Sequence, residues 1–289
     1  MMEQNQSIQT IIKQRFSCRT YENKPIAPQA RQQLEALIAQ ATVGPLGSKA
    51  RFALIAAAET DRQALKGLGT YGFIKNPAGF IVGAVGQAAN DMEDFGYLME
   101  KLILNATALG LGTCWLGGTF ARSRFARVID LQAGESLPAV ASLGYGASQP
   151  RARDVLIRRG AESNKRLPWE QLFFDGAFGT PLGREGAGKY AGPLEMVRLG
   201  PSASNKQPWR IVRQGGRWHF YLQRTPGYGK SVLGLAKMAD LQRVDVGIAL
   251  CHWALTAVAL ALPGAWQVSK PEIGRPDTLT EYAVTWAGV

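Results

Sequence analysis

The sequence predicts an α+β protein built from two tandem copies of one unit, because strand-like and helix-like segments recur in the same order. Gly44-Pro45 and Gly200-Pro201 stand 156 residues apart, and Lys24–Ile26 aligns with Thr180–Leu182 at the same offset. Farther along, Asp94–Trp115 matches Asp245–Trp266 at an offset of 151, with the Asp, a Gly, two Ala, Leu residues and the final Trp in common. Chance matches of Ala and Leu are common in buried helices, so the Pro and Trp anchors carry this interpretation. We predict repeats at residues 1–150 and 165–289, joined by a basic linker at 151–164.

The elements of each copy follow from hydrophobic periodicity. We expect helices at Gln29–Ala41, at Asp91–Leu109, which has a broad apolar face, and near Glu185–Leu199. Apolar or alternating runs predict strands, and these runs are "RFALIAA" from Arg51, "GFIVGAV" from Gly79, "AVASLGY" from Ala139, "WRIVRQ" from Trp209 and "RWHFYLQ" from Arg217. These strands are too few to give each copy a sheet of its own. We therefore expect two copies packed as a pseudo-symmetric pair around a shared core.

Composition excludes several classes of protein. The 289 residues carry a formal charge of +11, yet no aromatic-studded basic stripe accompanies the scattered Lys and Arg, so nucleic-acid binding is disfavoured. Three cysteines without C-x-x-C spacing and only two histidines argue against a disulfide framework, a metal site and a Ser-His-Asp triad. The apolar run Val244–Leu262 is interrupted by Asp245 and His252, which indicates a buried helix rather than a membrane span. We expect a cytoplasmic protein that is sufficient as a monomer.

The two copies retain opposite halves of one candidate site. Copy one carries Arg15, Ser17 and Arg19 at alternate positions, and two guanidiniums with a hydroxyl can grip a phosphate. At the offset of 156 their counterparts are Gln, Phe and Asp, at positions 171, 173 and 175. Copy two instead carries "PSASNKQPW" from Pro201, where copy one has "PLGSKARFA". This complementary loss predicts a single ligand site, although surface charge with a helix cap would also explain R-x-S-x-R alone.

The loop from Gly200 offers compact hydrogen-bonding groups on a stiff backbone. Its hydroxyl and amide side chains are Ser202, Ser204, Asn205 and Gln207, and the prolines Pro201 and Pro208 reduce the entropy lost on binding. Such groups suit a polar heterocycle and a polyol, while the arginine pair suits an anion. A flat heterocycle, a polyol chain and a phosphate together describe FMN.

Across nearly its whole length the chain resembles the FMN-dependent nitroreductase family, in its internally duplicated single-chain branch. The resemblance rests on four motifs, which follow one another along the chain as "RFSCR", "ALGLGTCWLGG", "LFFDGAFGTPL" and "GPSASNKQPWR". It implies a nitroreductase-like fold in which one FMN lies between two repeats. It also implies electron transfer from NAD(P)H to a small acceptor, such as a nitroaromatic or a quinone, by a ping-pong mechanism. A flavin-binding protein without reductase turnover is the alternative.

The resemblance also assigns cofactor contacts and requires no catalytic acid or base from the protein. Arg15, Phe16, Ser17 and Arg19 would contact the phosphate and ribityl chain, and Pro201, Ser202, Ser204 and Asn205 would reach the flavin from the other half. Gln207 belongs to the same loop. Backbone groups at Leu116, Gly117 and Gly118 would meet the flavin ring, although some members carry an acidic residue where this chain has Gly117. Arg151 and Arg153 would help to hold the phosphate.

Other motifs have plainer interpretations. "GLGTCW" lacks the third glycine of a dinucleotide-binding loop and follows a helix, so it does not predict a Rossmann fold. Cys18 is interpreted as a packed thiol, His219 as a polar strand residue and His252 as a hydrogen-bonded core histidine. The glycine-rich stretch Thr225–Met238 could be a mobile cover or an ordinary surface loop.

Overall fold

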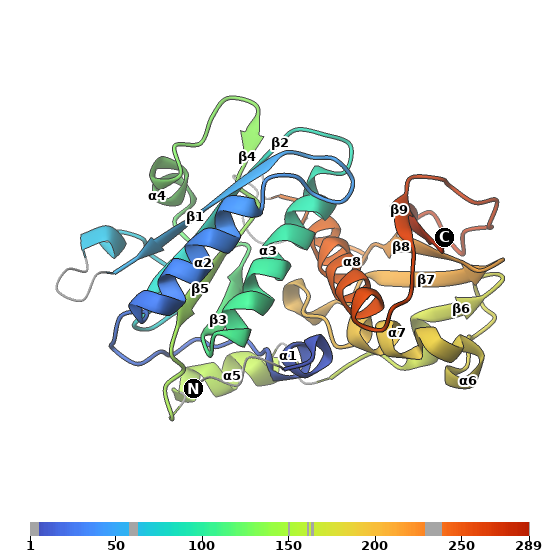
Figure 1. Cartoon of the computed structure of the whole chain (residues 1–289), viewed down its shortest axis with the longest axis horizontal. Helices are drawn as coiled ribbons and strands as arrows, with labels where there is room; N and C mark the ends of the chain where they lie inside the picture. Colours follow the sequence, from blue (N-terminus) through green and yellow to red (C-terminus); the bar gives the residue numbers. More distant parts are fainter. Residues whose placement is uncertain are drawn as a thin grey trace.

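Two five-stranded sheets form the framework of the protein (Figure 1). The computed structural model describes residues 6–57, 63–149, 151–160, 162, 165–228 and 239–288. The first sheet has the order β1 (Ala50–Ala56), β2 (Gly79–Gly86), β5 (Val140–Gly144) and β3 (Gly112–Leu116), and β4 (Glu135–Ser136) also pairs with β2. The second has the order β6 (Phe173–Asp175), β7 (Trp209–Gln214), β8 (Arg217–Gln223), β10 (Thr280–Ala287) and β9 (Ala265–Gln267).

Helices surround and separate the two sheets (Figure 1). The α-helices are α1 (Ile8–Gln14), α2 (Pro28–Gln40), α3 (Asp91–Ala108), α4 (Arg122–Val128), α5 (Ala152–Gly160), α6 (Arg184–Ala187), α7 (Ala191–Arg198) and α8 (Leu241–Ala259). Short 3₁₀ turns lie at η1 (Gln63–Leu65), η2 (Trp169–Gln171), η3 (Gly188–Tyr190) and η4 (Ala203–Asn205). The two long helices α3 and α8 pack against each other between the sheets, so the halves meet along them.

Both halves have the same topology. In each, a helix precedes two antiparallel strands, a long helix follows, and two further strands complete the sheet. The orders β1-β2-β5-β3 and β7-β8-β10-β9 correspond, and every neighbouring pair in both is antiparallel. This shared order agrees with the predicted repeats, while the duplication itself stays a prediction.

Glycines allow α3 and α8 to approach closely. A Cβ added at Gly96 would overlap the carbonyl oxygen of Val244, and one added at Gly247 would overlap the carbonyl oxygen of Glu93. At the offset of 151, Gly96 corresponds to Gly247 and Glu93 to Val244, so each contact is the other with its partners exchanged. That reciprocity is the pattern of an isologous interface between two equivalent units.

The expectation of too few strands for two sheets is wrong. It missed β3, β4, β6, β9 and β10, and with them each half has its own sheet and its own apolar core. The core of the first half gathers residues such as Leu34, Ile81 and Phe95, and that of the second is rich in tryptophan, including Trp209 and Trp253. The helix expected near Glu185–Leu199 is also broken, because Gly188 adopts a φ of 54° and ends α6.

None of the helices in the described ranges combines the length and the apolar character needed to cross a membrane.

Candidate functional site

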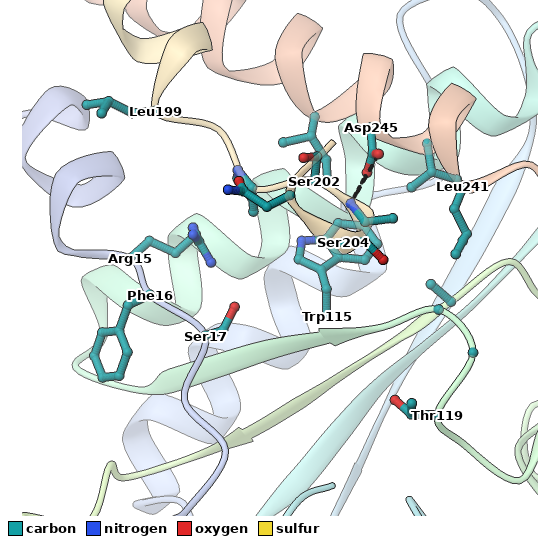
Figure 2. Close-up of a pocket in the computed structure, with 18 of the residues that line it drawn as sticks. Arg15, Phe16, Ser17, Trp115, Thr119, Leu199, Ser202, Ser204, Leu241 and Asp245 are labelled. Atoms are coloured by element: carbon teal, nitrogen blue, oxygen red, sulfur yellow. Dashed lines mark hydrogen bonds between the residues drawn. The ribbon is translucent and has the colours of Figure 1, made fainter. Parts of the chain in front are cut away.

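A cavity of 590 Å³ lies between the two halves. Its volume falls in the range of about 300 to 1,000 Å³ that is typical of small-molecule and cofactor sites. Both halves contribute to its walls, as Figure 2 shows for the N-terminal segment, the end of β3, the loop after α7 and the start of α8. The polar lining residues include Lys13, Arg15, Ser17, Arg19, Thr119, Arg166, Ser202, Ser204, Asn205, Tyr228 and Asp245.

The N-terminal segment reaches the cavity because helix α1 ends at Gln14 and Arg15 is already extended. Ser7 caps the helix by accepting a hydrogen bond from the Thr10 N–H at 3.2 Å. Beyond Arg15 the chain is extended beside β3, where the Cys18 N–H donates to the Thr113 carbonyl at 2.8 Å. Alternate side chains of an extended segment share a side. Arg15, Phe16, Ser17 and Arg19 all line the cavity, although the Phe16 ring is half-exposed and points away from it in Figure 2.

Arg15 carries a guanidinium that is buried and only partly engaged. The residue is 9% exposed, and within the described part of the chain its Nε and Nη1 have no hydrogen-bond partner. Its nearest ion-pair contact joins Nε to the Glu100 carboxylate at 3.7 Å, which is too long for a hydrogen bond. Buried donors without partners are costly, so this group is suited to an anionic ligand in the cavity.

The charge of the cavity wall is strongly positive. Lys13, Arg19 and Arg166 join Arg15 there, and Asp245 is the acidic residue among the described lining residues. Burial, with the nearby charges of Arg15 and Arg198, lowers the pKa of Arg166. Because Arg15 and Arg166 repel each other at partly buried positions, a bound phosphate would relieve their repulsion.

The loop that follows α7 holds an unusual backbone conformation. Ser204, Asn205 and Gln207 have φ angles of 50°, 54° and 48°, in the left-handed region that non-glycine residues seldom adopt. Such strain persists where the surroundings over-determine it and is common at ligand sites. Asp245 anchors this loop, since its two carboxylate oxygens accept from the Ala203 N–H at 2.9 and 3.1 Å (Figure 2).

Burial governs the ionisable groups around the loop. It raises the pKa of Asp245 well above the usual value, and the hydrogen bond from Ala203 offsets only part of the increase. Burial also raises the pKa of Tyr228, whose hydroxyl is hydrogen-bonded to Ser204. Both groups therefore favour their neutral forms more than they would in water.

Two of the predicted loop ligands are engaged in holding the segment between Glu162 and Leu167. The Asn205 amide donates to the carbonyls of Glu162 and Lys165 at 2.9 and 3.1 Å, although the residue still lines the cavity. The Gln207 side chain is buried and accepts from the Leu167 N–H at 2.8 Å, and the structure does not bring it to the cavity. Ser202 both lines the cavity and accepts from the Gln207 N–H at 2.8 Å. Sequence alone could not separate loop-forming amides from ligand-facing ones.

The turn after β3 forms the opposite wall. Gly117, Gly118 and Thr119 line the cavity, whereas Leu116 is the last residue of the strand and its side chain is buried in the core. A Cβ at Gly117 would lie 2.5 Å from the Leu241 Cδ1, so a larger residue requires that side chain to move. Close packing with α8 is therefore a physical reason for glycine at this position.

The predicted basic residues at the start of the linker are placed elsewhere. Arg151 does not line the cavity, because its guanidinium donates to the Phe73 carbonyl at 2.9 Å and pairs with Asp154 at 3.0 Å. The side chain of Arg153 lies outside the described residues, as do residues 229–238 of the suggested cover. Arg166 was not predicted, since a lone arginine just after a basic linker gives no spacing signal.

The matching positions in the other half do not line this cavity. The loop Gly44–Ser48 is closed onto Asp94, whose carboxylate oxygens each accept one backbone N–H, from Leu46 and from Ser48, at 2.8 Å. Phe173 is buried in the core, and Asp175 pairs with Arg213 at 2.7 Å. These groups are engaged by partners within the protein, and the single ligand site stays a prediction.

Comparisons with known proteins identify the family. The family model described as "Putative TM nitroreductase" matches residues 7–257. The chain is similar to the solved structure of a putative nitroreductase from Thermotoga maritima, with 19% identity over 97% of this chain and 93% of that chain and a TM-score of 0.60. A nitroreductase with bound FMN from Bacteroides fragilis matches with 19% identity over 51% of this chain and 92% of that chain, at a TM-score of 0.39. The comparison with curated proteins gives no match. Because the family model spans most of the chain, the protein belongs to this nitroreductase family, a family of oxidoreductases.

Proposed function

We propose that the protein is an FMN-dependent oxidoreductase that passes electrons from NAD(P)H to a small acceptor, such as a quinone or a nitroaromatic compound. One observation carries the proposal: a cofactor-sized cavity between the halves has a buried, partly engaged guanidinium at Arg15 on its wall. Family membership supports the oxidoreductase class, and the FMN held by the Bacteroides fragilis neighbour indicates the cofactor to test.

The residues present fit FMN in chemistry. Arg15 and Arg19, with Lys13 and Arg166, would hold the phosphate, and the Ser202 and Ser204 hydroxyls would bind the polyol. The apolar lining residues would accept a flat ring and exclude water from it, and they include Trp115, Ala139, Leu241, Val244 and Ile248. Backbone N–H groups of the turn at Gly117–Thr119 would serve as further donors.

The chemistry then divides between cofactor and protein. Bound FMN supplies the electron transfer, accepting a hydride and returning electrons to a second substrate. The protein binds and orients, and the basic wall favours the charge that a reduced ligand gains. No histidine or cysteine is among the described lining residues, which suits a mechanism without a dedicated acid–base side chain. Donor and acceptor would use the same space in turn, which predicts ping-pong kinetics.

The first test is the absorbance spectrum of the purified protein, with the released flavin counted per chain. One FMN per chain, bleached by NADH or NADPH and restored by a quinone, is the expected result. Two FMN per chain would contradict the asymmetric site. No flavin, even after FMN is added, would overturn the proposed cofactor.

The second candidate is a flavin-binding protein without reductase turnover. The amides of Asn205 and Gln207 tie the loop to Glu162 and Leu167, which would limit how far the loop can open for a large substrate. Tight FMN binding with no steady oxidation of NADH or NADPH by a quinone would select this candidate.

A further inference from the structure

A buried network of ionisable groups lies beside the cavity. Glu100 on α3 and His252 on α8 are both 0% exposed, and Nε2 of His252 lies 3.0 Å from Oε1 of Glu100. The other ring nitrogen, Nδ1, lies 2.8 Å from the Met196 carbonyl oxygen, and the Trp115 indole donates to Oε2 of Glu100 at 2.7 Å. His252 is thus the hydrogen-bonded core histidine predicted from the sequence, and its partners connect the two halves.

The hydrogen-bond geometry fixes the number of protons in this pair. A carbonyl oxygen only accepts, so Nδ1 of His252 must carry a proton. At 3.0 Å, Nε2 and Oε1 then need one further proton between them, held either by the imidazole or by the carboxyl group. In both arrangements the charges of His252 and Glu100 add up to zero.

This neutrality leaves the charge of Arg15 available. Its Nε lies 3.7 Å from Oε1 of Glu100 without a hydrogen bond, and its Nη1 also lacks a partner among the described residues. An unaccompanied Glu100 carboxylate at that distance would cancel the guanidinium charge and repel an anion in the cavity. With His252 beside it, Glu100 can hold the Trp115 indole without neutralising Arg15.

The opposite half shows that the fold does not need this network. At the offset of 151, Cys251 stands in place of Glu100 and Lys101 in place of His252. Trp266 stands in place of Trp115, and its Nε1 has no hydrogen-bond partner within the described part of the chain. Buried ionisable pairs add little stability on balance. A network present only beside the retained ligand site therefore indicates a role in binding.

We propose that His252 is a positioning residue for the anionic end of the ligand: by sharing a proton with Glu100, it keeps Arg15 free to bind a phosphate. The proposal rests on the proposed function, because the phosphate is that of the bound FMN. His252 acts through Glu100 and Arg15 and does not itself line the cavity.

The test compares FMN with riboflavin, which has the same ring and polyol but no phosphate. Dissociation constants are measured by quenching of flavin fluorescence for the wild type, His252→Gln, Glu100→Gln and the double variant. In His252→Gln a neutral amide faces Glu100, and the Arg15 guanidinium at 3.7 Å then favours a lone Glu100 carboxylate. The preference for FMN over riboflavin should fall by about tenfold or more, the scale of one unbalanced charge near the site.

Rescue distinguishes this role from simple packing. Glu100→Gln removes the carboxylate, so the double variant should regain the wild-type preference for FMN. An unchanged preference in His252→Gln, or a double variant no better than that single variant, would overturn the proposal. Should His252→Gln fail to fold, Glu100→Gln alone decides, because a tenfold fall in its preference contradicts the expected retention.

Failure of the proposed function gives a different result. A wild type that binds neither flavin contradicts the cofactor and leaves the charge argument testable with inorganic phosphate. The increase in melting temperature on adding phosphate should then be smaller in His252→Gln than in the wild type and should recover in the double variant. Equal increases in all variants would overturn the inference.

Discussion

Replacing Arg15 by alanine should weaken FMN binding strongly while leaving riboflavin binding nearly unchanged. The residue is 9% exposed, and its Nε and Nη1 have no hydrogen-bond partner among the described residues, so the substitution removes donors that a ligand would use. One hydrogen bond to a charged group contributes about 1.5–3 kcal/mol. The dissociation constant for FMN should therefore rise roughly 10- to 150-fold.

The assay is a fluorescence titration of apoprotein with FMN, and Arg51→Ala is the matched control. Arg51 lies on β1 of the same half, but its guanidinium pairs with Glu135 at 2.6 Å and is not part of the cavity wall. Its loss should leave the FMN affinity unchanged. A change below about threefold for Arg15→Ala, or equal losses in both variants, would refute an anion site at Arg15.

Three further outcomes are expected. Asp245→Ala removes the anchor of the loop that lines the cavity and should weaken FMN binding. Asp94→Ala, the equivalent change in the other half, should lower stability only, and equal effects of the two variants on FMN affinity would contradict this assignment. Gly247→Ala should destabilise the protein by roughly 1–3 kcal/mol in thermal or urea denaturation, since the new Cβ overlaps the backbone of α3, and a neutral result would mean that the helices can separate freely. Hydrogen bonds from Arg51 lower the pKa of Glu135 in the folded protein. The pair therefore stabilises the fold at pH values above the usual carboxyl pKa of about 4.3, and this stabilisation disappears as the pH falls through the lower pKa of the folded state. Glu135→Gln should therefore be less stable at pH 7 by about 1 kcal/mol or less, with the difference vanishing in acid; a difference that persists in acid would show another origin.

Local patterns predicted several elements well. The alternating runs from Trp209 and Arg217 coincide with β7 and β8, and the apolar face from Asp91 ends within one residue of α3. These segments agree because burial pattern and local propensity favour the same state. The long second helix was placed less well, since α8 begins at Leu241 and ends at Ala259.

The missed strands show the limit of predicting secondary structure from local sequence patterns. Gly112–Leu116 was not among the predicted strands, yet it forms β3 by pairing with β5 on one side and meeting Ser17 on the other. Those partners are distant in the sequence, and pairing rather than propensity makes the strand. The same holds for the short strand β9.

The candidate site was predicted in outline and corrected in detail. Alternate spacing placed Arg15, Ser17 and Arg19 together, and their extended backbone explains why. The roles of Gln207 and Arg151 depend on partners in the linker and in the first half, which no sequence spacing encodes. Their contacts with the cofactor remain predictions that the structure does not favour.

The crossing of α3 and α8 has a consequence for how the protein can change over generations. In an assembly of two identical chains, one altered codon changes both sides of such a contact at once. Here Gly96 and Gly247 are separate positions in one gene, so each side can vary while the other is held. A single chain with two such halves can therefore vary residues around one pocket without repeating the change around a second, and dilution cannot separate the halves.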